Sequence, residues 1–211
     1  MKLRHATLII FIIVLIDQFS KIYVKTNFIY EEEVEVFSWF KLHFIENEGM
    51  AWGTVIPGDY GKLILTVFRI FAVFGIAYWL YDSVMREKSN FLIVAISLIF
   101  AGALGNIIDS VLYGVMFNDS HGQLATFFPH DHYGTWFHGR VVDMFYFPIW
   151  EGQLPSWLPF WGGQNFRFFN AIFNFADFAI STGVGILIFF NKKSFTLPEK
   201  SISRVYSDKL D

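Results

Sequence analysis

The sequence has no cysteine and few charged residues, and both shortages narrow the classes of protein to which it can belong. Asp, Glu, Lys and Arg make up 17% of its 211 residues. A soluble domain usually has about a quarter. Without cysteine there is neither a disulfide framework nor a thiolate nucleophile. The net charge of -3 comes without a block of basic residues, so we expect no nucleic-acid partner.

Long apolar runs are what the sequence has instead. Hydrophobic residues make up 54% of the chain and aromatic residues 20%. Four segments approach the length of about 20 apolar residues that a helix needs to cross a bilayer. They are residues 6–24, 63–81, 91–112 and 168–190. We therefore expect a mainly α membrane protein with four transmembrane helices, formed as a single domain over residues 1–211. No small-residue cleavage site follows the first run, which favours a retained helix over a cleaved leader.

Basic residues predict the orientation of these helices. They precede the first run, separate the second from the third, and follow the fourth, whereas the acidic stretch EEEVE lies at 31–35. By the positive-inside rule, both termini should be cytoplasmic. Residues 25–61 and 113–167 then lie outside, and residues 192–211 form a cytoplasmic tail.

The two outer regions have different patterns. Apolar residues at positions 34, 36, 40, 42 and 44 alternate with polar ones, which predicts strands of a small extracytoplasmic β-sheet. Residues 113–167 are rich in Gly, Pro, His and aromatic residues and follow no helical period, so we expect extended outer loops. Within them, WEGQLPSWLPFWGG is typical of an interfacial loop whose Trp and Phe lie at headgroup level.

Polar residues inside the apolar runs fall at a common depth. At 1.5 Å per residue, Asp17 and Asp177 lie about 20 Å from the cytoplasmic face, and Asn106 and Asp109 about 24 to 28 Å. All four belong to the outer half of a hydrocarbon core about 30 Å thick. Asn174 falls on the same helix face as Asp177. One polar cluster near the outer surface explains them together, although isolated interhelical hydrogen bonds are the simpler alternative.

Five short motifs contain most of these polar residues. In chain order they are DQFSK (17–21), ENEGMAWG (46–53), GALGNIIDS (102–110), GRVVDMF (139–145) and FNFAD (173–177). Their order and spacing resemble the lipoprotein signal peptidases, the type II signal peptidases of bacteria. The resemblance covers the chain from the first apolar run to the fourth.

This resemblance implies an aspartic endopeptidase of the bacterial cytoplasmic (inner) membrane, with its active site at the extracytoplasmic face. Its substrate would be a prolipoprotein whose signal helix is embedded in membrane lipid, cut just before a cysteine that carries a diacylglyceryl group. Asp143 and Asp177 would form the catalytic dyad. No cofactor or metal is implied, and we expect a monomer.

The other motif residues are expected to bind substrate or to support the dyad. These are Asp17, Lys21, Asn47, Gly49, Asn106, Asp109, Arg140, Asn174 and Ala176. Three features depart from the family pattern. Ser110 stands where the family usually has Arg, so that Arg140 or Arg69 would have to supply the basic side chain. Met144 replaces a usual Phe, and segments 114–138 and 148–167 are longer than the family's connections.

Two carboxylates are sufficient for amide hydrolysis without a metal or a covalent intermediate. The ionised acid takes a proton from water while the protonated acid donates to the carbonyl oxygen. Like charges so close cannot both ionise, and burial pushes a carboxyl pKa in the same upward direction. The titration then belongs to the pair of acids.

Other interpretations remain open on the sequence. Intramembrane carboxylates also relay protons in carriers and channel components, although the repeated halves of such carriers are not visible here. A non-catalytic protein could use the aromatic outer loops to bind a partner. The loop histidines His121, His130, His132 and His138 could bind a metal, although no helix fixes their spacing.

Overall fold

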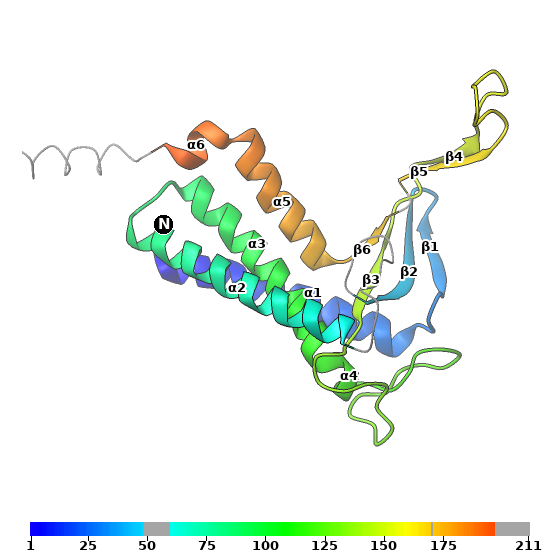
Figure 1. Ribbon diagram of the computed structural model, residues 1–211, viewed down its shortest axis with the longest axis horizontal. Helices are drawn as coiled ribbons and strands as arrows, with labels where there is room; N and C mark the ends of the chain where they lie inside the picture. Colours follow the sequence, from blue (N-terminus) through cyan, green and yellow to red (C-terminus); the bar gives the residue numbers. More distant parts are fainter. Residues whose placement is uncertain (49–59, 170, 197–211) are drawn as a thin grey trace, which may run out of the picture.

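The computed structural model describes residues 1–48, 60–169 and 171–196. Its described part contains three helices long and apolar enough to cross a membrane. Helices α1 (Leu3–Asn27) and α2 (Gly61–Met85) are continuous, whereas α3 (Asn90–Ile108) continues through a π-helical turn, η2 (Asp109–Tyr113), into the short α4 (Gly114–Met116). These helices extend the predicted first three runs by a few residues at most ends. The fold is thus of the membrane type. Helices α1, α2 and α3 are drawn in blue, cyan and green in Figure 1.

The fourth apolar run is not helical over its whole predicted length of 168–190. Helix α5 covers Phe175–Phe189, about 22 Å at 1.5 Å per residue, and the short α6 (Asn191–Phe195) follows. The prediction of helix from residue 168 is wrong, because Phe168 belongs to a strand and residues 172–173 form another. The side chain of Asn174 accepts a hydrogen bond from the backbone N–H of Asp177, which fixes where the helix begins.

The predicted small sheet is present. Its strands are β1 (Glu33–Phe37), β2 (Phe40–Asn47), β3 (Val141–Tyr146) and β6 (Ile172–Phe173), paired antiparallel in the order β1-β2-β3-β6. The alternation of residues 34–44 therefore predicts strands correctly. Strand β3 lies in the centre, although it comes from a region for which we expect only loops.

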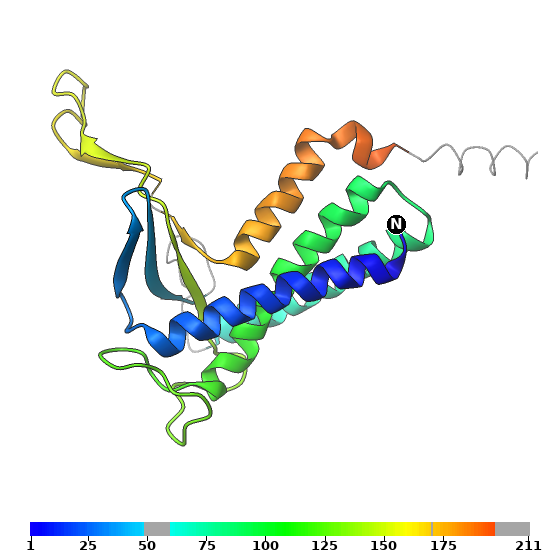
Figure 2. The ribbon, with the colours of Figure 1, turned by 180° about the vertical axis from the view of Figure 1, so that it is seen from behind.

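A separate hairpin follows β3. It consists of β4 (Trp150–Gln153) and β5 (Asn165–Phe168), and Figures 1 and 2 show it projecting away from the four-stranded sheet. The stretch predicted as an interfacial loop forms part of this hairpin and its tip. Trp157 and Phe160 at the tip are exposed.

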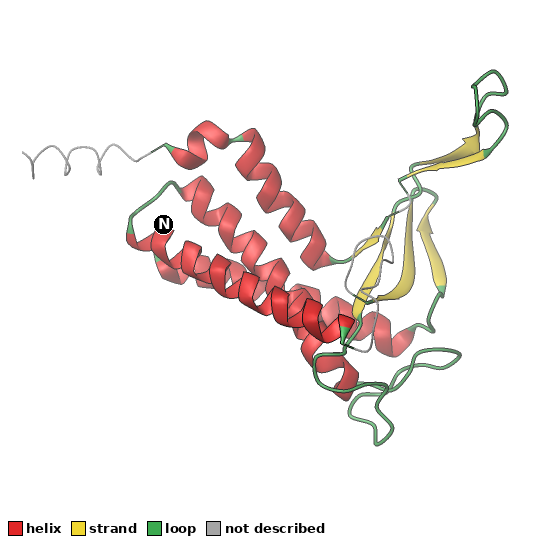
Figure 3. Ribbon diagram, in the orientation of Figure 1, coloured by secondary structure: helices red, strands yellow, loops and turns green. Residues whose placement is uncertain are grey.

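The strands run across one end of the helices, as the colouring by secondary structure in Figure 3 makes plain. At the opposite end, the N-terminus lies beside the α2–α3 connection, where the amino group of Met1 donates to the side chain of Asn90 at 2.7 Å. Helix α6 lies at that end too. The molecule therefore has a purely helical end and an end where helices and sheet meet.

One face of the sheet closes a hydrophobic core at this second end. Val142 and Met144 of β3 pack with Phe28 after α1, and with Tyr113 and Phe117 near the end of the third helix. Asp143 lies between Val142 and Met144, and successive side chains of a strand point to opposite faces. Asp143 is therefore directed toward the other face of the sheet.

Candidate functional site

Asp143 is held in place by two asparagine side chains. Asn174 donates from Nδ2 to its Oδ1 at 2.7 Å, and Asn47 of β2 donates from Nδ2 to its Oδ2 at 3.3 Å. The Asp143 side chain has only 4% of its surface exposed. A buried carboxylate needs such donors, because losing water without replacement hydrogen bonds costs several kcal/mol.

Asp177 belongs to a capping box at the start of α5. Its Oδ2 accepts a hydrogen bond from the backbone N–H of Asn174 at 3.3 Å, while its own N–H donates to Asn174 Oδ1 at 2.9 Å. Its Oδ1 accepts from Asn106 Nδ2 of α3 at 2.8 Å. The local sequence thus fixes the backbone of Asp177, and a contact with α3 orients the end of its side chain.

Asn174 joins the two acids. The side-chain amide of Asn174 donates one hydrogen bond to Asp143 and another to Asn106 Oδ1, at 3.1 Å. The backbone N–H of Asn174 donates to Asp177. Because Asn174 follows β6 and caps α5, the strand acid and the helix acid converge on one residue. The shared depth predicted for Asp177, Asn106 and Asn174 corresponds to direct contact.

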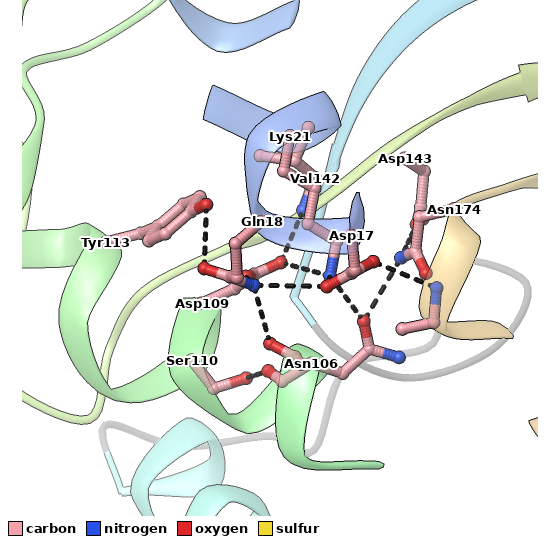
Figure 4. A network of polar contacts seen from close by, with 12 residues as sticks. Asp17, Gln18, Lys21, Asn106, Asp109, Ser110, Tyr113, Val142, Asp143 and Asn174 are labelled. Atoms are coloured by element: carbon pink, nitrogen blue, oxygen red, sulfur yellow. Dashed lines mark hydrogen bonds and ion pairs between the residues drawn. The ribbon is translucent and has the colours of Figure 1, made fainter. Parts of the chain in front are cut away.

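Lys21 lies on the α1 side of this pair, and all three N–H groups of its ammonium group contact oxygen atoms. Its ammonium group contacts Asp17 Oδ2 at 2.9 Å, Asp109 Oδ2 at 2.8 Å and Asn106 Oδ1 at 2.8 Å. Lys21, Asp17 and Asp109 are all completely buried. Figure 4 shows this cluster between the α1 and α3 ribbons, connected to Asp143 through Asn106 and Asn174.

Asp17 and Asp109 support the surrounding backbone as well as Lys21. Asp17 Oδ1 accepts a hydrogen bond from the Ala176 N–H at 2.9 Å, satisfying a donor in the first turn of α5. Asp109 Oδ2 accepts from the Val142 N–H at 3.3 Å, next to Asp143 on β3. A Cβ at Gly105 would overlap the Asp17 carboxylate, so glycine is required for this close approach.

Gln18 and Tyr113 belong to the same network, although we expected no role for them. Gln18 Nε2 donates to Asp109 Oδ1 at 2.9 Å and to both Asp17 Oδ2 and the Gly105 carbonyl at 3.1 Å. Tyr113 OH donates to Gln18 Oε1 at 3.2 Å. Gln18 lies within DQFSK, so membership of that motif was the available signal, whereas Tyr113 offered none beyond its apolar setting.

The pKa of Asp143 is raised from 3.8 to about 7, mainly because burial disfavours the charged form. The negative charge of Asp177 adds to this increase. Hydrogen bonds from Asn47 and Asn174 and the positive charge of Lys21 oppose it. Asp143 therefore titrates near neutral pH.

Arg140 does not contact the two acids through any hydrogen bond or ion pair among the described residues. It pairs instead with Glu46 Oε2 at 3.0 Å and Glu48 Oε1 at 3.2 Å. Glu46 also binds the buried Lys25 and accepts a hydrogen bond from Ser120. These contacts tie the loop before β3 to β2 and α1, and within the described residues the ion pairs of Arg140 are with these glutamates and not with Asp143 or Asp177.

Ser110 does not replace the arginine expected at its position. Its hydroxyl donates to the Asn106 carbonyl at 2.9 Å, within the helix. Arg69 of α2 is the basic side chain whose charge acts on both Asp177 and Asp143. Gly49, expected to allow close approach of the substrate, lies outside the described residues.

The loop histidines do not gather as metal ligands. Within the part of the chain that the structure describes, no group of three His, Asp or Glu side chains could hold a metal ion. His121 instead pairs with Asp119, and its ring lies 4.3 Å from that of Tyr30.

Comparison with known proteins gives consistent matches over most of the chain. The family model described as signal peptidase (SPase) II matches residues 9–192. A lipoprotein signal peptidase of Porphyromonas gingivalis is 50% identical over 186 residues, which cover 87% of this chain and 80% of that protein. One of Amoebophilus asiaticus is 35% identical over 163 residues, covering 76% and 65%.

A solved structure also resembles the fold. It is described as a bacterial membrane enzyme determined by the in meso method at 2.3 Å resolution. It aligns with a TM-score of 0.61 and 25% identity over 90% of this chain and 89% of that one. The sequence motifs, the fold and these matches agree, and the chain belongs to the signal peptidase II family, a family of peptidases.

Proposed function

We propose that this chain is an aspartic endopeptidase that removes the signal peptide from diacylglyceryl-modified prolipoproteins, with Asp143 and Asp177 as its catalytic pair. The observation that carries the proposal is the contact of both acids with Asn174. The name of the relative that is 50% identical, a lipoprotein signal peptidase, supports the substrate class. It also favours hydrolysis over the transport of protons by a carrier.

The two acids have different surroundings. Asp177 lies in the first turn of α5, at the positive end of the helix dipole. Asp143 is buried, and its pKa of about 7 favours the neutral form below that pH. In the proposed resting state, the Asp177 carboxylate accepts a proton from the attacking water. The Asp143 carboxyl donates to the oxygen of the scissile carbonyl.

The remaining residues have supporting roles in this proposal. Asn47, Asn106 and Asn174 orient the two carboxyl groups by the hydrogen bonds described above. Lys21, Asp17, Asp109 and Ala176 hold α1, α3, β3 and the start of α5 together beneath the pair. The chemistry requires no metal or cofactor, because water is activated by a carboxylate.

The proposed topology is a single membrane-embedded domain with four spans and both termini in the cytoplasm. Helix α5 is only about 22 Å long, which is shorter than a usual span. It is followed by α6, whose Lys192 and Lys193 can extend their long side chains to the headgroups. The location of the N-terminus, the α2–α3 connection and α6 at one end supports this arrangement. The catalytic pair then lies at the extracytoplasmic face of the bacterial inner membrane, and the enzyme acts as a monomer.

The test is cleavage of a lipid-modified precursor by the purified protein in lipid nanodiscs. Asp143→Asn and Asp177→Asn remove the proton transfer that each acid performs, so each should reduce the rate at least about 100-fold. Gel mobility of the precursor and of its product measures the rate. The melting temperature in the same nanodiscs establishes that each variant is folded.

Asp131→Asn is the matched control, because Asp131 is an exposed aspartate of the outer loop. It should cleave at the rate of the unmodified protein. Undiminished cleavage by either Asp143→Asn or Asp177→Asn would disprove the proposed dyad. Loss of cleavage on treatment with a chelator would instead indicate metal chemistry.

A further inference from the structure

A row of aromatic rings crosses the end of the sheet farthest from α1. Ring centroids lie 5.4 Å apart for Phe37 and Trp39, 6.1 Å for Trp39 and Phe147, and 5.6 Å for Phe147 and Phe173. Phe40 stacks on Phe147 at 4.9 Å. These five residues, which we call the aromatic row, come from β1, β2, β6, the β1–β2 turn and the residue that follows β3.

The aromatic row lies on the same face of the sheet as Asp143. Side chains two residues apart on a strand share a face, so Asp143 and Phe145 point the same way. Phe145 is also the direct partner of Phe173 on β6, and the two rings are 6.2 Å apart. The row therefore begins beside the catalytic pair and continues along the same surface.

The opposite face at this end carries the charges. Glu35 pairs across the strands with Lys41, and Lys41 pairs with Tyr146 of β3. Lys41 also contacts Glu33 at 2.6 Å on that face. On the face of the aromatic row, the corresponding neighbours are apolar, with Val34 opposite Leu42. This end of the sheet is thus amphipathic, like an element that lies between water and an apolar phase.

The apolar face is the one that meets the start of α5. Asp143 on that face bonds Asn174 at the start of α5, whereas Val142 and Met144 on the other face close the core under α1. Figures 1 and 2 show the sheet extending past the start of α5 on the side away from α1. The aromatic row consequently lies over the region beside α5, where Phe178 is 56% exposed.

We propose that the aromatic row rests on the headgroup region of the lipid bilayer beside α5. Trp39 and Phe37 are 58% and 55% exposed, and aromatic rings are favoured at the boundary between lipid and water. Phe173 of the row lies two residues before the start of α5, and α5 exposes Phe178, Val184 and Ile188, which is why lipid is the occupant. The contact holds the sheet, and Asp143 with it, at a set height above the bilayer. The lipid contact itself does not depend on the peptidase activity.

The absence of cysteine permits a direct test with single-cysteine variants. Trp39→Cys and Phe37→Cys each receive a nitroxide label, and the protein is reconstituted in phosphatidylcholine nanodiscs. Power-saturation EPR measures collisions of the label with oxygen, which concentrates in lipid, and with a water-soluble nickel chelate. Lys41→Cys on the opposite face of the sheet is the matched control.

Labels at 39 and 37 should have an oxygen-to-nickel collision ratio several-fold higher than the label at 41. Equal, water-like ratios at all three positions would overturn the proposal. Water-like ratios at 39 and 37 that rise only when a lipid-modified precursor is added would also overturn it, and would assign the row to the substrate. Two variants are used so that a folding defect in one leaves the other informative.

Discussion

Lys21 and Lys25 lie one turn apart on α1, and both side chains are completely buried. Lys21 is surrounded by oxygen atoms of Asp17, Asp109 and Asn106. Lys25 contacts Glu46 and Ser120, and three aromatic rings have centroids 5.0 to 5.8 Å from its ammonium group. The same residue type, on the same face of one helix, therefore has two different surroundings.

The surroundings of Lys21 and Lys25 differ because their neighbours come from different elements of the fold. All partners of Lys21 come from helices α1 and α3 and the turn η2, and they lead directly to the two acids. The partners of Lys25 come from β2 and from the loop between α4 and β3. Lys21 thus organises the site, whereas Lys25 fastens an outer loop to the helices. One helical turn of α1 therefore separates a lysine that belongs to the candidate site from one that stabilises the surrounding structure.

Replacing Lys21 should have the largest effect. Lys21→Met leaves two buried carboxylates, Asp17 and Asp109, without their shared cation. Removing one partner of a buried ion pair costs about 3 to 5 kcal/mol. We expect loss of cleavage and a strongly lowered melting temperature in detergent. A variant with unchanged stability would show that the two acids are protonated and need no cation.

The pH dependence of stability should reveal Asp143, on which the Lys21 charge acts. Its pKa is about 7 when folded and 3.8 in the reference state, so the folded protein binds the proton more tightly. The contribution of Asp143 to the free energy of unfolding is fully present below about pH 4 and is lost as the pH rises to about 7. A pKa shift of this size corresponds to about 4 kcal/mol in the free energy of unfolding before the site relaxes. We therefore expect the free energy of unfolding to fall by a few kcal/mol as the pH rises.

Melting temperatures of the unmodified protein and of Asp143→Asn, measured from pH 4 to pH 8, check this prediction. Asp143→Asn should make the decrease between pH 4 and pH 7 smaller. Lys25→Met should keep that decrease, because the contacts of Lys25 are with Glu46 and Ser120. An identical decrease in Asp143→Asn would assign the titration to another group.

Replacing Lys25 should have a smaller effect than replacing Lys21. In Lys25→Met, Glu46 keeps its contacts with Arg140 at 3.0 Å and Ser120 at 3.1 Å, so no carboxylate is left without a partner. We expect a loss of about 1 to 3 kcal/mol, with cleavage per folded molecule retained. Thermal unfolding and precursor cleavage measure the two quantities. Loss of cleavage in a folded Lys25→Met protein would contradict the separation of site from scaffold.

Ser120→Ala should have the smallest effect in this series. The Ser120 hydroxyl accepts from Lys25 at 3.0 Å and donates to Glu46 at 3.1 Å, and both partners keep each other when it is removed. A loss of about 0.5 to 1.5 kcal/mol follows. Hydrogen exchange should increase in residues 117–133 and stay unchanged in α3. Increased exchange in α3 would mean that the two lysine clusters are coupled.

The network around Lys21 was largely predictable, because charged residues in apolar helices must find partners. Asp17, Asn106 and Asp177 stood out by their depth alone, and depth along a helix follows from a fixed rise per residue. Asp143 was different, since its strand lies in a region without a readable period and only the family motif indicated it. The start of α5 was missed because seven residues of an apolar aromatic run can equally be strand or helix.

By itself, the sequence determined the number of apolar runs, the strand alternation in residues 34–44 and the identity of the polar residues near the outer boundary. These properties depend on composition and local periodicity. Only the tertiary structure decided that Asn174 joins Asp143 to Asp177, that Lys21 and Lys25 have separate partners, and that Arg140 turns to Glu46. Those contacts link residues far apart in the chain, and side-chain spacing along a strand or helix does not determine which distant elements meet.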